Sequence, residues 1–184
     1  MKIVVVSGTY REGRKSHGVA VCLNRELLSL GYTTELVDLQ AYNLPVLEYI
    51  YAKHPAPTEA MHKLHSIFDS ADAFILVTPE YNGAPAASLK NSLDYFRKEY
   101  YRKVMGICTV SSGALGGMRA ATSLQQMVLW YGGVPVSQML TVPKVQNHFD
   151  EEGNLSDSEF KPNIDKFIES FLWLSDAVTV KRNS

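Results

Sequence analysis

The chain has 184 residues, of which 46% are hydrophobic, and its 18 Lys and Arg residues nearly balance 19 Asp and Glu residues. This composition excludes a disordered chain and predicts one globular domain over residues 1–184. The net charge of -1 lacks the basic excess that nucleic-acid binders usually carry, so we expect no nucleic-acid partner.

Strand-like and helix-like segments alternate along the chain. Continuous apolar runs predict strands at residues 2–7, 33–38, 72–78, 103–110 and 134–141. Between and after them, apolar residues recur at the three- to four-residue spacing of helices. The pattern predicts an α/β fold: a flavodoxin-like doubly wound sheet of five parallel strands in the order 2-1-3-4-5, with helices on both faces. In such a sheet, the loops after strands 1, 3 and 4 converge where ligands bind.

The loop after the first predicted strand, residues 7–18, has the composition of an anion site. The helix that follows it points unpaired backbone N–H groups and the positive end of its dipole at the loop. Glycines and cations complete the pattern. The residues concerned are Ser7, Gly8, Thr9, Arg11, Gly13, Arg14, Lys15 and Ser16. This loop therefore predicts a phosphate-binding site.

Two further loops are placed to reach the same ligand. The third predicted strand stops in a turn, residues 79–85, whose tyrosine ring and asparagine amide can contact a planar heterocycle. The fourth is followed by a small, glycine-rich loop, residues 111–119, whose backbone can approach closely. A bound molecule with a phosphate at one end and a flat ring at the other would suit these three loops.

Together, the three motifs resemble the NAD(P)H-dependent FMN reductase family, a flavodoxin-like group that includes quinone, azo-dye and chromate reductases. The similarity covers essentially the whole chain. It comprises a Ser-Gly-x-x-Arg…Ser loop, the turn Pro79-Glu80-Tyr81-Asn82 followed by Leu89-Lys90-Asn91-Ser92-Leu93-Asp94, and a Ser-Ser-Gly…Gly-Gly-x-Arg loop. The motifs occur in order at the ends of predicted strands one, three and four.

The resemblance implies a bound FMN and a role in holding it for residues of each loop. Its phosphate is assigned to Ser7, Thr9, Arg11, Ser16, His17 and Gly18. The isoalloxazine and ribityl region is assigned to Pro79, Glu80, Tyr81, Asn82 and Gly83, and the other edge of the ring to Ser111, Ser112 and Gly113. Family members often have Ser or Asn where this chain has Thr9 and His17, and an imidazole near a phosphate can make its binding depend on pH.

The implied function is that of an oxidoreductase in which NADPH or NADH donates a hydride to FMN. Electrons then pass by a ping-pong mechanism to a small-molecule acceptor such as a flavin, a quinone or an azo compound. The flavin carries the chemistry, so we expect no catalytic side chain and no metal. Arg14, Lys15 and Arg119 are candidates to contact the 2′-phosphate of NADPH.

Two other functions stay open at this point. A non-enzymatic flavodoxin-type electron carrier would share the fold and FMN, although such carriers are commonly strongly acidic and this chain has a net charge of -1. A P-loop-like nucleotide-binding protein is the second alternative, because residues 8–16 nearly match that motif. The segment contains one residue too many, which moves Lys15 out of register with the phosphates.

The resemblance also implies a homodimer or homotetramer. The helix after the third predicted strand is expected to end in segment 95–101, which is rich in aromatic residues and predicts an interface core. The long loop 42–57 is expected to border the substrate entrance or an interface. His62 and His65, with Glu59, are interpreted as surface residues rather than half of a metal site.

Cysteine content and the first residues bear on location. Cys22 and Cys108 are too few for a disulfide framework and are expected to be core residues. No apolar stretch has the length of a membrane span, and the chain enters a strand-like run at Lys2 with no signal-peptide pattern. The sequence therefore predicts a cytoplasmic protein with no membrane partner.

Overall fold

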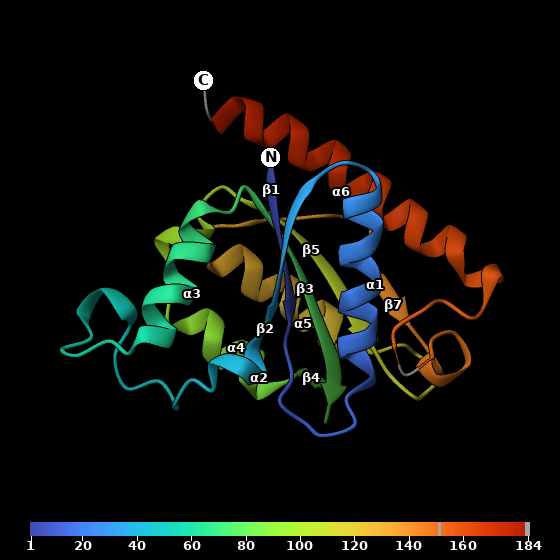
Figure 1. Ribbon diagram of the computed structural model, residues 1–184, viewed down its shortest axis with the longest axis horizontal. Coiled ribbons are helices and arrows are strands. Elements are labelled where there is room, and N and C mark those ends of the chain that lie inside the picture. The colour runs from blue at the N-terminus through green and yellow to red at the C-terminus, as the bar shows by residue number, and fades with distance from the viewer. Residues whose placement is uncertain (151, 183–184) are drawn as a thin grey trace.

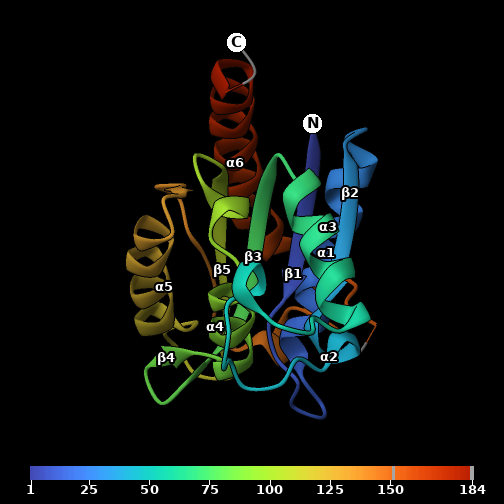
Figure 2. The same cartoon turned by 90° about the vertical axis from the view of Figure 1, so that its left-hand side faces the viewer.

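The computed structural model describes residues 1–150 and 152–182, and it places a largely parallel sheet between two layers of helices (Figures 1 and 2). The main strands run side by side in the order β2-β1-β3-β5-β6, while β4 pairs with β3 and β7 with β5. Their bounds are β1 Lys2–Ser7, β2 Thr33–Asp38, β3 Ala73–Tyr81, β4 Ala84–Pro85, β5 Val104–Val110, β6 Val134–Pro135 and β7 Leu140–Val142.

Helices cover both faces of the sheet, with α1 and α6 on one side and α3, α4 and α5 on the other (Figure 1). Across the two described ranges, none of the helices is both long and apolar enough to cross a membrane. The α-helices are α1 Lys15–Ser29, α2 Leu39–Tyr42, α3 Glu59–Ser70, α4 Ala87–Asp94, α5 Met118–Trp130 and α6 Lys161–Arg182. Short 3₁₀ turns lie at Tyr51–Lys53, Lys98–Tyr100, Val145–Asn147 and Ser158–Phe160.

The apolar runs of the strands explain this layering. Successive side chains on a strand point to opposite faces, so a run with no polar interruption has to be covered on both. On β1, Ile3 and Val5 pack under α1 and α6, whereas Val4 and Val6 pack under α3, α4 and α5. All four side chains are fully buried. The core is therefore divided in two by the sheet.

The predicted order of the main strands is confirmed, but the sheet has seven strands within the described residues and not the predicted five parallel ones. The fifth predicted strand, 134–141, is two short pieces, β6 and β7, that both pair with β5. Pro135 has no backbone N–H and is tolerated here because β6 lies at the edge of the sheet. The third strand continues past residue 78 to Tyr81 and turns back as β4.

The hairpin between β3 and β4 follows from two residues that the sequence interpretation treated only as part of a turn. Asn82 and Gly83 have φ values of 53° and 82°. Two consecutive residues with positive φ form the tight turn whose twist matches that of antiparallel strands, and Asn-Gly is its preferred sequence. This signal was present in the sequence and predicts the observed hairpin.

The interface prediction for segment 95–101 rested on its aromatic residues, and that interpretation was wrong for most of them. Tyr95, Phe96 and Tyr100 are 2%, 1% and 0% exposed, respectively. They belong to the core beneath α3 and α4, where Phe68 contacts both Phe96 and Tyr100. The segment is rich in aromatic residues because it fills this chain's own core. The exposed residues of the segment are Arg97, Lys98 and Tyr101.

Candidate functional site

Three loops meet in one cleft at the carboxyl edge of the sheet. The cleft is lined by residues 11–16 from the loop after β1 and the start of α1, residues 79–81 from the end of β3, and residues 110–112 from the end of β5, together with Val145. These strands are neighbours in the sheet, so their carboxyl ends lie side by side. The predicted convergence of the three loops is therefore present in the structure.

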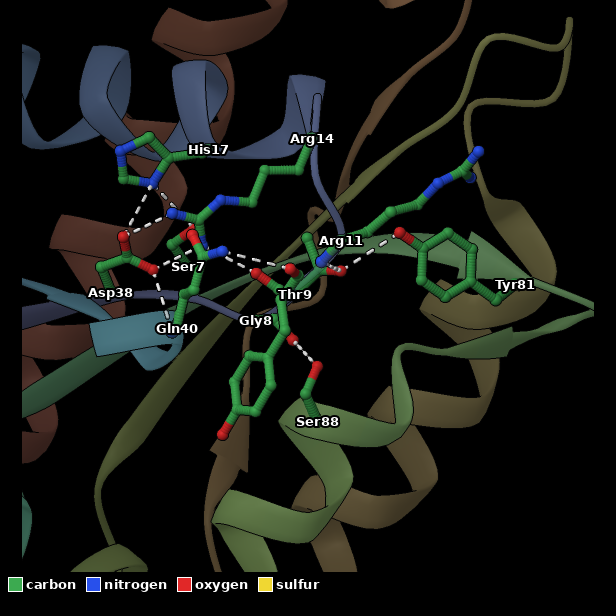
Figure 3. Close-up of polar contacts among 11 residues, drawn as sticks. Ser7, Gly8, Thr9, Arg11, Arg14, His17, Asp38, Gln40, Tyr81 and Ser88 are labelled. Atoms are coloured by element: carbon green, nitrogen blue, oxygen red, sulfur yellow. Dashed lines mark hydrogen bonds and ion pairs between the residues drawn. The ribbon is translucent and has the colours of Figure 1, made fainter. Parts of the chain in front are cut away.

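Gly8 allows the first loop to begin this close to β3. Its backbone N–H donates to the carbonyl oxygen of Val77 at 2.9 Å. A Cβ atom at residue 8 would lie 2.9 Å from that same oxygen and 2.9 Å from Cβ of Leu89. The side chain of Ser88, on α4, donates to the carbonyl oxygen of Gly8 at 2.7 Å (Figure 3). Only a glycine fits between β3 and α4 without moving one of them.

The end of the cleft beside α1 has the properties of an anion cradle. The hydroxyl of Ser16 is buried and has no hydrogen-bond partner within residues 1–150 and 152–182. Residues 15–18, the first turn of α1, carry no acidic side chain, and no side chain caps the helix there. Backbone N–H groups at a helix start and a buried hydroxyl without a partner are the donors that a phosphate group accepts from.

Arg14 and Asp38 hold the far end of the first loop (Figure 3). The two terminal nitrogens of Arg14 donate to the two carboxylate oxygens of Asp38, each at 2.5 Å. Arg14 also donates to the carbonyl oxygen of Thr9 at 2.7 Å. Burial by itself raises the pKa of Asp38, but hydrogen bonds from Arg14 and from the backbone N–H of Gln40 outweigh it and lower that pKa. The carboxylate is therefore held in its charged form.

His17 lies on the Asp38 side of the loop (Figure 3). Its Nδ1 shares a hydrogen bond of 3.1 Å with the hydroxyl of Ser7 and lies 3.9 Å from an oxygen of Asp38. Burial and the neighbouring Arg14 lower the pKa of His17, and Asp38 only partly opposes them. The neutral imidazole is thus favoured. The roles of Ser7 and His17 at the phosphate stay predictions.

Tyr81 joins the hairpin to the first loop. Its hydroxyl shares a hydrogen bond of 3.1 Å with the hydroxyl of Thr9, and the guanidinium of Arg11 lies 5.8 Å from its ring centre. Thr9 in turn accepts from the backbone N–H of Arg11 at 3.3 Å. The side chain of Tyr81 is therefore held at the cleft by its hydroxyl and by the guanidinium over its ring.

Glu80 joins the hairpin to the third loop. One carboxylate oxygen accepts from the backbone N–H groups of Arg119 and Ala120, at 3.1 and 3.3 Å. The other lies 3.5 Å from the guanidinium of Arg119. Because Gly117 precedes α5 and offers no side-chain cap, Glu80 supplies the acceptor for the start of that helix. The side chain of Glu80 is thus engaged by α5, and contact of Glu80 with a ligand stays a prediction.

The third loop is fastened to β7 by its backbone. Ser111 N–H donates to the carbonyl oxygen of Val142 at 3.0 Å, and Val145 N–H donates to that of Ser111 at 3.1 Å. The side-chain oxygen of Ser111 accepts from the N–H of Gly113 at 2.9 Å. Ser111 and Ser112 line the cleft. The two backbone hydrogen bonds use the N–H and carbonyl groups of Ser111, so they fix the loop in place beside the cleft.

The structure brings seven of the fourteen predicted site residues into one cleft. Arg11, Ser16, Pro79, Glu80, Tyr81, Ser111 and Ser112 line the cleft. Thr9 touches Tyr81, whereas Ser7 and His17 lie beside Asp38. Asn82 and Gly83 form the hairpin turn, and Gly113 is exposed in the third loop.

Gly18 has a neighbour that the sequence interpretation did not consider. A Cβ atom at residue 18 would lie 3.0 Å from Cα of Gly153, so the segment around residue 153 packs directly on α1. This contact gives a packing reason for the glycine. Its assignment to the phosphate stays a prediction.

Sequence reasoning missed two kinds of residue in the site. Asp38 ends β2, the strand next to β1, so an acidic residue at that position could have been placed beside the first loop. Val110 and Val145 line the cleft but carry no polar signal. Their position depends on the pairing of β5 with β7, which the apolar pattern alone does not reveal.

Loop 42–57 packs against α3 and α4. The side chain of Asn91 donates to the carbonyl oxygen of Pro45 at 2.7 Å and accepts from the N–H of Leu47 at 2.9 Å. The ring of Tyr51 stacks on His65 with 4.3 Å between centres, and its hydroxyl shares a hydrogen bond of 2.8 Å with His62. The two histidines thus serve to hold this loop.

Such a cleft, with an anion cradle at the start of α1 and with a hairpin tyrosine and a small, fixed loop beside it, is what an FMN-binding protein of the flavodoxin-like class needs. The residues fit this ligand: the hydroxyl of Ser16, which has no partner among the described residues, and the start of α1 suit a phosphate. The chain belongs to the NADPH-dependent FMN reductase family, whose sequence pattern matches residues 1–147. As a member, it is an oxidoreductase that uses FMN and takes electrons from NAD(P)H.

Individual relatives agree with this assignment. The chain is 34% identical over 125 residues to an NADPH azoreductase of a Bacillus species, a match that covers 67% of this chain and 66%, just under two thirds, of that protein. It is 28% identical over 180 residues to an NAD(P)H-dependent FMN reductase of Pseudomonas aeruginosa, with 95% of each chain covered.

A solved structure shows the same fold. FerB, a flavoenzyme NAD(P)H:(acceptor) oxidoreductase from Paracoccus denitrificans, superimposes with a TM-score of 0.79 at 20% identity and covers 96% of this chain and 97% of its own. The flavodoxin-like architecture predicted from the sequence is therefore confirmed.

Replacing Glu80 tests its role at the start of α5. We expect Glu80→Ala to lower the free energy of unfolding by about 0.5–2 kcal/mol, because the backbone N–H groups of Arg119 and Ala120 lose their acceptor. The measurement is urea unfolding followed by circular dichroism. Glu12→Ala is the matched control, since it removes the same charge from the cleft lining. Equal losses in both variants would contradict the capping role.

Proposed function

We propose that this protein transfers electrons from NADPH or NADH to flavins, quinones, azo compounds or similar small acceptors, which use the same cleft in turn. The observation that carries this proposal is the meeting of the three loops around a cleft with an anion cradle at one end. When bound, FMN supplies the redox chemistry: it accepts a hydride equivalent from the nicotinamide and passes two electrons to the acceptor.

The residues of the chain bind and orient. Ser16, Arg11 and the start of α1 are proposed to hold the phosphate by neutral donors, charge and the helix dipole. Residues 79–83 and 111–113 are proposed to flank the ring with backbone groups and the fixed ring of Tyr81. Hydrogen bonds to the edge of a flavin alter its reduction potential, so these segments also tune the electronics. This scheme requires no acid or base from a side chain.

The rival interpretations lose their support. The family assignment favours a reductase over an electron carrier and over a P-loop protein. Of the three candidates for the 2′-phosphate of NADPH, Arg14 is already held by Asp38 and the carbonyl of Thr9. The side chain of Arg119 is 70% exposed, and its guanidinium lies 3.5 Å from a carboxylate oxygen of Glu80, which is a long, weak contact. We therefore favour Arg119 over Arg14 for that contact.

We further propose a cytoplasmic homodimer or homotetramer. The cysteines support the cytoplasmic location. Cys22 and Cys108 are both buried free thiols, and burial raises the pKa of Cys22 to about 11, so neither is suited to reactivity or to forming a disulfide. Trp130 on α5 and Trp173 on α6 are 86% and 74% exposed, and each would be buried if a second copy covered its face of the molecule. Sedimentation equilibrium at micromolar concentration should give twice or four times the chain mass, and a monomeric mass would contradict this proposal.

The test of the main proposal is the visible absorbance spectrum of the purified protein, reconstituted with FMN if it is colourless. We expect two flavin bands that bleach when NADPH or NADH is added without oxygen. Initial rates with a quinone as acceptor should then give parallel double-reciprocal lines, because the two substrates use one cleft in turn. Failure to bind FMN would overturn the proposal, and bands that persist with both nucleotides would favour an electron carrier.

Arg11→Ala tests the orientation of the ligand. We expect FMN affinity to fall at least tenfold while riboflavin, which lacks the phosphate, binds with nearly unchanged affinity, because the loss of a charge-assisted contact affects only the phosphate. Quenching of flavin fluorescence gives both constants. Arg97→Ala, at an exposed arginine outside the cleft lining, is the control. Unchanged FMN affinity in Arg11→Ala would show that the phosphate is misplaced.

A further inference from the structure

We propose that Asp38 is a positioning residue for phosphate binding: through Arg14 it holds residues 9–14 in the shape that receives the FMN phosphate, without touching the phosphate itself. The inference rests on the proposed function, because it takes the loop after β1 as the phosphate site. Nothing in the resemblance assigns Asp38 a role. The proposal comes from contacts that cross between β2 and the loop (Figure 3).

Asp38 is itself firmly held. It is the last residue of β2 and pairs in register with Ser7, the last residue of β1. Oδ1 also accepts from the backbone N–H of Gln40 at 3.1 Å, so that Asp38 caps α2. The side chain of Gln40 reaches back to the carbonyl oxygen of Tyr10 at 3.3 Å. The carboxylate therefore stands on the rigid sheet and faces the loop.

Arg14 transmits this position to both ends of the loop. It is the residue just before α1, and its side chain reaches back along the loop. There the guanidinium donates a hydrogen bond to the carbonyl oxygen of Thr9 at 2.7 Å. Its side chain is only 12% exposed. The guanidinium of Arg14 thus links the two ends of the segment 9–14, and its ion pair with Asp38 holds that link in place. Losing the carboxylate frees the segment between them to change shape.

The sign of the effect separates positioning from simple electrostatics. A carboxylate near a phosphate repels it, so an effect of charge alone predicts tighter FMN binding when Asp38 is neutralised. Positioning predicts the opposite, because a loop that has lost its anchor has to be ordered when the ligand binds. His17, 3.9 Å from Asp38, faces the same carboxylate and is present in both cases. The two explanations therefore differ in direction, not only in size.

The experiment compares the apo-protein and its variants Asp38→Asn, Arg14→Gln and the double variant, with FMN and with riboflavin. We expect each single variant to bind FMN at least tenfold more weakly, and the double variant to be no weaker than the poorer single variant, because both substitutions break one linkage. Riboflavin affinity should change less than threefold. A role in general stability would weaken both ligands alike.

Two further variants complete the design. Asp72→Asn removes another aspartate that pairs with an arginine, Arg182, at the amino end of β3, and it should leave FMN binding unchanged. Asp38→Glu keeps the charge but displaces it by one methylene group. We expect it to weaken FMN binding, and it provides the test if Asp38→Asn does not fold.

The outcomes are distinct. Tighter or unchanged FMN binding in Asp38→Asn overturns the inference, as does an unchanged affinity in Asp38→Glu. A loss in Arg14→Gln that Asp38→Asn does not share would mean that Arg14 contacts the phosphate directly, and it also overturns the inference. If the unsubstituted protein binds no FMN, the proposed function fails, and the inference fails with it. If the unsubstituted protein binds FMN and the variants bind it with unchanged affinity, the inference is overturned while the proposed function stands.

Discussion

Burial of the sheet on both faces is the constraint on which the rest of the structure depends. Strands with no polar alternation are stable only between two layers of helices, and such strands run parallel because each crossover contains a helix. Parallel strands in turn put every strand-to-helix loop on one edge. The cleft is thus a consequence of the apolar runs in β1, β3 and β5, which position three loops far apart in sequence.

Parallel strands bring the loops near one another, and specific contacts then fix them. Gly8 lets the first loop pass against β3, the Thr9 to Tyr81 hydrogen bond ties it to the hairpin, and Glu80 ties the hairpin to α5. Each contact joins two segments that are far apart in the sequence. A site assembled in this way is largely formed before the ligand arrives, which lowers the entropy cost of binding.

Much of the fold could be predicted because it is encoded in local patterns. Apolar runs and helical spacing gave the order of elements, and the three loop motifs gave the place of the site. What could not be predicted depends on pairing across the fold. The aromatic residues Phe96 and Tyr100 resemble an interface in composition, and only their contacts with Phe68 show that they are core. The hairpin at Asn82 and Gly83, by contrast, has a local sequence signal, and it could have been predicted from that pair of residues.

The candidate site shows the same division. Residue types that bind phosphate led to the proposal of Ser16 and Arg11, since hydroxyls and cations at a helix start are a local signal. Composition could not show which cation serves the ligand and which serves the loop. Arg14 has the same chemistry as Arg11, and its role is decided by Asp38, which lies 24 residues further along the chain and reaches Arg14 only because β2 pairs with β1.

This distinction changes the electrostatic account of the cleft. Counted from the sequence, the first loop carries a cluster of cations. In the folded protein, Asp38 neutralises the charge of Arg14, so the cradle depends less on net positive charge than the sequence indicates. More of the affinity for a phosphate then has to come from oriented neutral donors, namely the start of α1 and the buried hydroxyl of Ser16. Fixed dipoles act only when the loop holds them in place, which makes the shape of residues 9–14 as important for binding as their charge.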